Sequence, residues 1–124
     1  MAAQRVRLDI AAQNLANANT TETAAGGPYR RQEVVFRASP IGDDGEGGLQ
    51  GVQVARLEND PSPFPVKEVP GANPGDPPRQ IEQPNVNMVN EMVDISTAAR
   101  SFEANVTAFE ALKQMVLKSM ELGR

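Results

Sequence analysis

The chain has 124 residues and a formal net charge of −4 at neutral pH, and it contains no histidine and no cysteine. This composition removes the commonest general base, the thiolate nucleophiles, the usual zinc ligands and any disulfide framework. An acidic balance also argues against a nucleic-acid partner, because phosphate binding needs a basic surface. We therefore predict no catalytic, cofactor-binding or metal site and no small-molecule substrate; an enzyme could be built only on carboxylates such as Asp43, Asp44 and Glu46.

Composition also divides the chain into three regions. Nine of the ten prolines and seven of the ten glycines lie between residues 38 and 84, a density typical of turns or disorder. We predict an N-terminal helix and Asn-rich turn (1–24), a middle β/irregular segment (25–84) and a long C-terminal helix (85–124). The predicted fold class is mainly α, with the N- and C-terminal helices forming a coiled-coil-like pair, as one discontinuous domain, beside a small irregular β-containing Pro/Gly-rich middle segment.

Residues 2 to about 18 predict a helix, because they are rich in Ala, Gln, Arg and Leu and lack Gly and Pro. On a helical wheel, one side carries Leu8, Ala11, Ala12 and Leu15, and the nearly opposite side carries Ala3, Val6 and Ile10. This pattern fits either a helix covered on two sides or a weakly specified surface helix. At roughly 25 Å, this helix could cover only half of the C-terminal helix described below.

Three asparagines follow one another closely between Asn14 and Thr21. Asparagine competes for backbone hydrogen bonds and tolerates left-handed dihedral angles, so we favour C-capping of the helix over a ligand site. Asn14 lies a turn too early to be a cap. A bridge between the backbones of neighbouring helices would account for it.

Two alternating stretches in the middle segment predict strands. Tyr29–Arg37 follows a Gly-Gly-Pro turn, and Gly51–Leu57 is expected to pair with Val34–Phe36 as a hairpin. We interpret Arg30 and Arg31 as solvated strand residues or interfacial donors rather than as a phosphate site.

The remainder of the middle segment predicts irregular structure. Ser39–Gly48 superficially resembles a calcium loop, but it lacks the alternating oxygen ligands and the closing glutamate of an EF-hand, so we predict a mobile acidic loop. The prolines of Asp60–Lys67 cannot join a central ladder, which indicates an edge or an extended conformation. We interpret Pro70–Pro84 as a linker of similar character.

Asn87–Leu122 predicts a single long amphipathic helix, and the rest of the chain is organised around it. Apolar residues recur at steps of three and four: Met92, Ile95, Ala99, Phe102, Val106, Phe109, Val116 and Met120, with Leu112 carrying one turn. Asn85 or Asn87 would cap its start, and Gly123 would end it. At about 50 Å this helix is too long to be buried in a domain of this size, so its apolar stripe needs a partner.

Several stretches resemble proteins of the bacterial flagellar axis. Residues 11–21, with the sequence AAQNLANANTT, resemble the asparagine-rich N-terminal signature of these axial proteins. Four further stretches are similar to the flagellar basal-body rod protein family, in its proximal-rod branch: Gly26–Arg31, Pro84–Asn87, Glu91–Ile95 and Ala99–Val106. The resemblance spans nearly the whole chain. Relatives usually begin upstream of Met1, and they tend to carry an aromatic residue near Gln80–Glu82.

The resemblance implies a non-enzymatic structural subunit that polymerises helically into the drive shaft for motility. Its implied partners are itself, other rod proteins, the flagellar type III export apparatus and the surrounding basal-body rings. The implied location is the rod of the basal body in the periplasmic space, reached without a cleaved signal peptide.

We predict that the subunit interface is formed by residues on both terminal helices: Val6, Leu8, Ile10, Asn14, Leu15, Asn17, Met92, Ile95, Ala99, Arg100, Phe102, Asn105, Val106, Phe109, Leu112 and Val116. Polar members of this set would define the register, because an unpaired buried polar group costs about 1–3 kcal/mol. The alternative function is a soluble helical binding module, such as a secretion chaperone or adaptor, that grips one partner helix with the same stripe.

Overall fold

The computed structural model describes residues 1–40 and 50–123. Its elements, in chain order, are helix α1 (Ala2–Ala16), strands β1 (Gln32–Pro40), β2 (Gln50–Asn59), β3 (Val66–Val69) and β4 (Arg79–Glu82), and helix α2 (Met88–Leu122). Both predicted helices are confirmed to within two residues at each end. Most of the predicted acidic loop, with Asp43, Asp44 and Glu46, lies outside the described residues.

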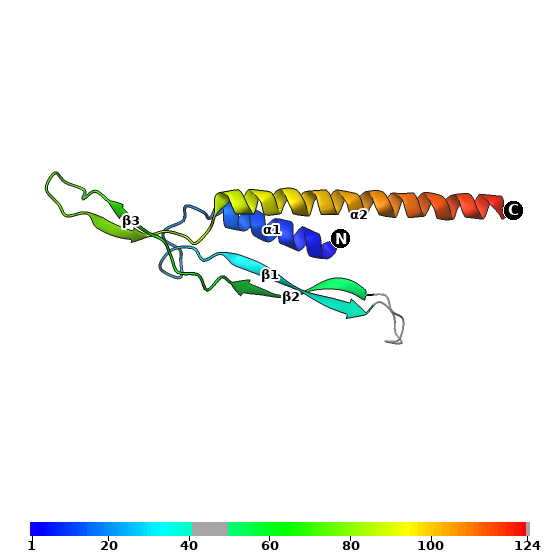
Figure 1. Cartoon of the computed structure of the whole chain (residues 1–124), viewed down its shortest axis with the longest axis horizontal. Coiled ribbons are helices and arrows are strands. Elements are labelled where there is room, and N and C mark those ends of the chain that lie inside the picture. The colour runs from blue at the N-terminus through cyan, green and yellow to red at the C-terminus, as the bar shows by residue number, and fades with distance from the viewer. Residues whose placement is uncertain (41–49, 124) are drawn as a thin grey trace.

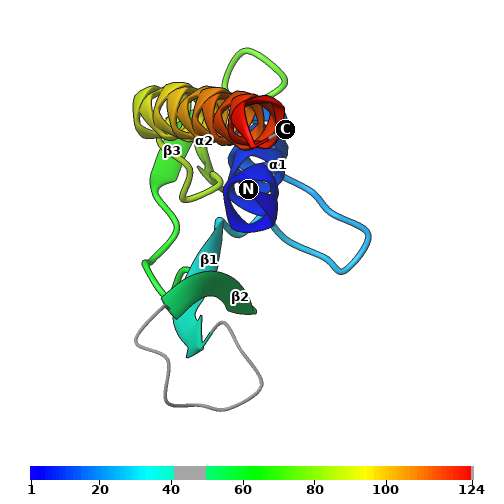
Figure 2. The ribbon, with the colours of Figure 1, turned by 90° about the vertical axis from the view of Figure 1, so that its right-hand side faces the viewer.

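The molecule is elongated along α2 (Figure 1). Helix α1 runs antiparallel to the N-terminal half of α2, and the β1–β2 hairpin lies on the other side of α1. Figure 2 shows α1 between α2 and the hairpin. The first of the two interpretations of the N-terminal helix, coverage on two sides, is therefore correct.

The apolar core is small. Among the described residues, the buried apolar side chains are Ala3, Ile10, Ala11, Pro84 and Ala98. Ile10 and Ala11 were predicted on opposite faces of the helix, yet both are buried, whereas Ala12 is exposed. Consecutive helical residues are about 100° apart, so both can be buried because α1 is covered on two sides.

The first hairpin confirms the predicted strand pairing. Strand β1 pairs antiparallel with β2, with Val34 opposite Leu57 and Phe36 opposite Val54, and the register shifts between Val35 and Phe36. The predicted start of the first strand at Tyr29 is wrong by three residues, since β1 begins at Gln32. The reason is that side chains from other segments hold the backbone before Gln32, as described below.

The interpretation of Pro70–Pro84 as a linker is wrong. Strand β3 pairs antiparallel with β4 in a second ribbon, which projects from the end of the molecule opposite the C-terminus (Figure 1). The strands contain no proline, in agreement with the expectation that prolines stay outside the ladder. The prolines and glycines lie in the connecting turn, where Gly75 has a φ of 109°.

Helix α2 resolves the choice of N-cap. The side chain of Asn87 accepts hydrogen bonds from the backbone N–H groups of Val89 and Asn90, at 3.0 and 3.3 Å. The helix ends at Gly123, as predicted. Within the described residues, no helix combines the length and the apolar character needed to cross a membrane.

Candidate functional site

A polar junction joins the two helices to the first hairpin; we use this name for Asn14, Arg31, Asn85 and Glu91. Asn14 lies in the last turns of α1 and is only 1% exposed. Its amide oxygen accepts hydrogen bonds from the Gln32 backbone N–H and from the Tyr29 hydroxyl, both at 3.0 Å. Its amide nitrogen donates to the Gln32 carbonyl at 2.8 Å and to the Glu91 carboxylate at 3.1 Å. All four hydrogen-bonding positions of the amide are therefore used.

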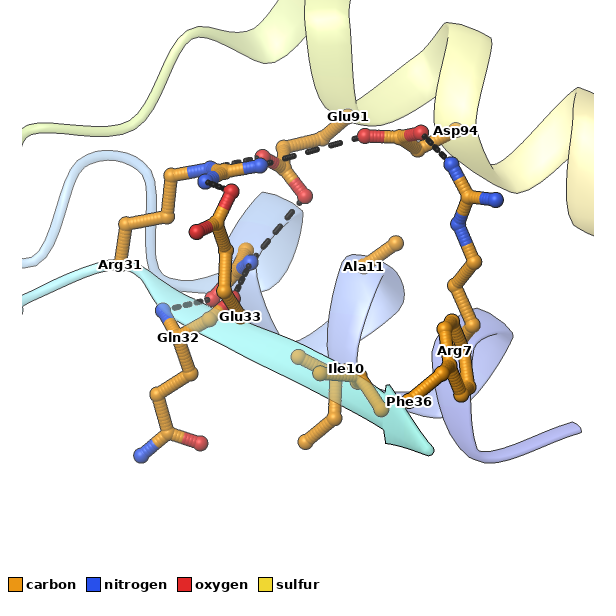
Figure 3. Close-up of a pocket in the computed structure, with 11 residues that line it drawn as sticks. Arg7, Ile10, Ala11, Arg31, Gln32, Glu33, Phe36, Glu91 and Asp94 are labelled. Carbon is orange, nitrogen blue, oxygen red and sulfur yellow. Dashed lines mark hydrogen bonds and ion pairs between the residues drawn. The ribbon is translucent and has the colours of Figure 1, made fainter. Parts of the chain in front are cut away.

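Glu91, in the first turn of α2, places a carboxylate inside the junction and is 1% exposed. Arg31 Nε donates to Glu91 Oε1 at 2.6 Å, and the Arg31 guanidinium also pairs with Glu33 at 2.7 Å (Figure 3). The guanidinium pairs with Asp60 as well, at 3.5 Å. A buried charge is tolerated only when it is paired and hydrogen-bonded. Burial by itself lowers the pKa of Arg31, but the hydrogen bonds to Glu33 and Glu91 outweigh burial and raise it.

Asn85 completes the junction from the segment before α2. Its amide oxygen accepts a hydrogen bond from the Arg31 backbone N–H at 2.8 Å, and the Arg31 carbonyl accepts one from the Asp60 N–H at 2.8 Å. The consecutive peptide units of Arg31 and Gln32 are thus held by two asparagine side chains from distant parts of the chain. This arrangement explains why the regular strand begins only at Gln32.

The two arginines predicted as solvated strand residues or interfacial donors have different environments. The Arg31 side chain is only 17% exposed, so the solvated interpretation is wrong for this residue. Arg30 donates to the carbonyls of Asp60 and Ser62 at 2.8 and 3.2 Å. Its guanidinium carbon also lies 4.3 Å from the centre of the Phe64 ring, a cation–π geometry. Both arginines act as donors within the chain.

Two further pKa shifts report the same packing. Burial raises the pKa of Tyr29, and the nearby Glu91 carboxylate raises it further. Hydrogen bonds from Ser62, together with the Arg31 charge, lower the pKa of Asp60.

An open cavity of about 350 Å³ lies between α1, β1 and α2. Figure 3 shows Arg31, Glu91, Asp94 and Arg7 along one side of it, and Ile10 and Phe36 near β1. Its carboxylates are paired with arginines, including Asp94 with Arg7, so they are engaged in structural contacts rather than presented to a substrate. In the described part of the chain, no three acidic, His or Cys side chains form a metal-ion cluster.

Some of the predicted interface residues are buried within the folded chain, and others are exposed on its surface. Ile10 and Asn14 are buried. Half-buried members are Val6, Leu8, Leu15, Asn17, Ile95, Ala99 and Val106. Exposed members are Met92, Arg100, Phe102, Asn105, Phe109, Leu112 and Val116. Asn14 links α1 to the backbone of β1 and to the Glu91 side chain of α2, so the predicted bridge between two helix backbones is wrong. Asn17 hydrogen-bonds the Gln13 carbonyl at 2.9 Å, which confirms the predicted capping role of the asparagine run.

The side of α2 that packs against α1 continues beyond the end of α1. Glu91 and Ala98 are the buried residues of α2, seven positions apart. At about 100° per residue, Phe102, Phe109 and Val116 lie on the same side of the helix. Phe109 and Val116 are 63% and 58% exposed, and neighbouring Leu112 and Met120 are 61% and 67% exposed. We call Phe102, Phe109, Leu112, Val116 and Met120 the uncovered face.

We did not predict that Tyr29, Arg31, Asn85 and Glu91 form a cluster. One feature of the sequence pointed to it: Glu91 lies in line with Ala98, Phe102 and Phe109 on the apolar side of the predicted helix. A carboxylate at such a position needs a buried cationic partner. The sequence does not say that this partner is Arg31, sixty residues away.

Comparison with known proteins identifies the class. A family model described as "Flagella basal body rod protein" matches residues 1–22, and one described as "Flagellar basal body rod FlgEFG protein C-terminal" matches residues 79–122. These ranges contain α1 and α2 with Asn14, Asn85 and Glu91. The fold and the junction thus belong to a rod protein of the flagellar basal body.

Full-length relatives identify the family. The chain is 39% identical over 137 residues to the flagellar basal-body rod protein FlgC of Borreliella burgdorferi, covering 98% of this chain and 90% of the relative. It is 37% identical to the protein of that name from Salmonella typhimurium over 124 residues, covering 100% of this chain and 90% of the relative. The Bacillus subtilis relative is 35% identical over 138 residues, with 100% and 91% covered. The chain belongs to the FlgC family of flagellar basal-body rod proteins, and it is a structural subunit of the basal-body rod.

Proposed function

We propose that this rod subunit polymerises helically through its terminal helices, with the uncovered face of α2 packing against helices of neighbouring subunits in a coiled-coil-like layer. The observation that carries the proposal is a run of large apolar side chains on α2 beyond the reach of α1. Burying one such side chain contributes roughly 1.5–3 kcal/mol. Several per contact, repeated over many subunits, would make a stiff shaft from individually modest contacts.

The distribution of charge along α2 supports this orientation. Arg100, Glu110 and Lys118 lie on the side away from the uncovered face, at about 100° per residue. Of the polar residues in the predicted interface, Asn105 lies on the same side as the uncovered face and would define register there, whereas Arg100 lies on the opposite side.

In this proposal the chain works as two parts. Residues 1–24 and 85–124 form one discontinuous helical domain that faces other subunits, and residues 25–84 form an outer segment. Other rod proteins and basal-body components are the partners, in keeping with the names of the relatives. We also propose a periplasmic location, export through the flagellar type III apparatus without a cleaved signal peptide, contact with the surrounding rings, and no catalytic role.

The test compares two charge substitutions on the same turn of α2. Phe109→Asp places a charge on the uncovered face, and Ala111→Asp places the same charge about 200° away. Both residues are exposed, so neither change disturbs packing within the chain. A strain lacking the chain is complemented with the wild type or with either variant. Swimming is measured in soft agar, and rods are examined by electron microscopy of basal bodies.

We expect Phe109→Asp to give truncated rods and no swimming, while Ala111→Asp behaves like the wild type. Normal rods with Phe109→Asp would refute the assigned interface. Complete basal bodies in the strain lacking the chain would instead favour the alternative of a helical binding module that forms a finite complex.

A further inference from the structure

The β1–β2 hairpin contacts the two helices at two places, one mainly apolar and one polar. Toward the middle of α1, Ile10, Ala11, Val34 and Phe36 line the open cavity of about 350 Å³. Protein interiors are normally close-packed, and side chains that line a void lose contact partners on that side. The apolar contact therefore defines the position of the hairpin poorly.

The second place is the polar junction, at the beginning of β1. Here the Arg31 and Gln32 N–H groups donate to the side-chain oxygens of Asn85 and Asn14 at 2.8 and 3.0 Å, and the Gln32 carbonyl accepts from Asn14 at 2.8 Å. The Arg31 side chain reaches Glu91 on α2, at 2.6 Å. One short stretch of backbone is therefore tied to both helices, and directional hydrogen bonds specify an orientation that non-directional apolar contact cannot specify.

We propose that the polar junction is the rigid connection that sets the orientation of the β1–β2 hairpin relative to the helix pair. Without it, the hairpin would swing about its attachment, because the cavity beside Phe36 offers room for movement. If the helices form the shaft as proposed above, force between the helices and the outer hairpin passes through Arg31 and Glu91. This consequence rests on the proposed function, whereas the rigid connection itself does not.

The test measures the distance between hairpin and helix in the purified full-length chain. The chain contains no cysteine, so spin labels on introduced cysteines are site-specific. We would place them by Gln53→Cys on β2 and Thr97→Cys on α2, both exposed positions. The distance distribution is recorded by pulsed electron paramagnetic resonance, and helicity by circular dichroism.

Two junction variants are compared with a matched control. Asn14→Leu removes the amide, and Arg31→Lys keeps the charge but loses the planar fork that spans several acceptors. The control is Arg56→Lys, in an ion pair with Glu58 whose side chains are 64% and 48% exposed. We expect one narrow distance peak in the control and its loss, with unchanged helicity, in both junction variants.

A narrow peak in both junction variants would overturn the proposal. So would a loss of helicity in Arg31→Lys, since the junction would then hold the helix pair itself together. Neither outcome depends on polymerisation, so a failure here is distinct from normal rod assembly with Phe109→Asp, which bears on the proposed function alone.

Discussion

Removing the arginine of the buried ion pair should destabilise the chain more than removing both partners. In Arg31→Met the Glu91 carboxylate, which is 1% exposed in the structure, loses its cation and keeps only the Asn14 amide as a partner. Breaking a buried pair in this way costs about 3–5 kcal/mol, because an uncompensated buried charge remains. We expect about 3 kcal/mol, since the Arg31 side chain is 17% exposed and water can enter the space that it leaves. That is a large fraction of the roughly 5–15 kcal/mol that stabilises a typical domain.

The double variant Arg31→Met/Glu91→Leu should recover part of this loss, because no charge is left buried in the junction. Free energies of unfolding would be measured by urea titration with circular dichroism at neutral pH. Arg56→Met, at the exposed pair with Glu58, is the control and should change stability by about 0.5 kcal/mol or less. A double variant no more stable than Arg31→Met, or a control as damaging as Arg31→Met, would refute the reasoning.

Three further predictions follow from other parts of the structure. Asn87→Ala removes the acceptor for two N–H groups of the first turn of α2 and should cost about 1 kcal/mol in the same titration, whereas an unchanged midpoint would exclude a capping role. The single tyrosine, Tyr29, should ionise above its ordinary pKa of 10.0 in the folded chain and near that value in urea, as followed by ultraviolet absorbance. Because burial favours the neutral phenol, its contribution to stability is complete below pH 10 and is lost as pH rises through the raised pKa; coincident titrations would contradict the burial. In the dilute chain, amides of 105–122 should exchange hydrogen much faster than those of 91–101, since only the latter pack against α1, and equal protection would contradict this.

Local sequence patterns predicted the elements that depend on neighbouring residues. The absence of Gly and Pro between Asn85 and Leu122 predicted α2 to within one residue of each observed end. Alternation in Val34–Phe36 and Gly51–Leu57 predicted the first hairpin and its pairing. The β3–β4 ribbon was missed because Val66–Val69 and Arg79–Glu82 are short and are surrounded by prolines, so each is a weak pattern until the two pair.

Local sequence patterns do not predict the polar junction. Asn85 and Asn87 have similar local surroundings, and either could cap a helix. Asn87 caps α2, because Asn85 is held against the Arg31 backbone, fifty-four residues away. In the same way, nothing near Arg31 in the sequence distinguishes it from Arg30, although only Arg31 meets the Glu91 carboxylate.

By itself the sequence determined that the chain has two terminal helices, where α2 begins and ends, and that α2 carries more apolar surface than α1 can cover. These properties follow from periodicity and from helix-breaking residues, which act within a few turns of the chain. Only the tertiary structure decided which polar residues are buried. A buried carboxylate such as Glu91 is stable only when it has a cationic partner. Because this partner, Arg31, comes from a distant segment, the burial of Glu91 depends on how all the elements pack together.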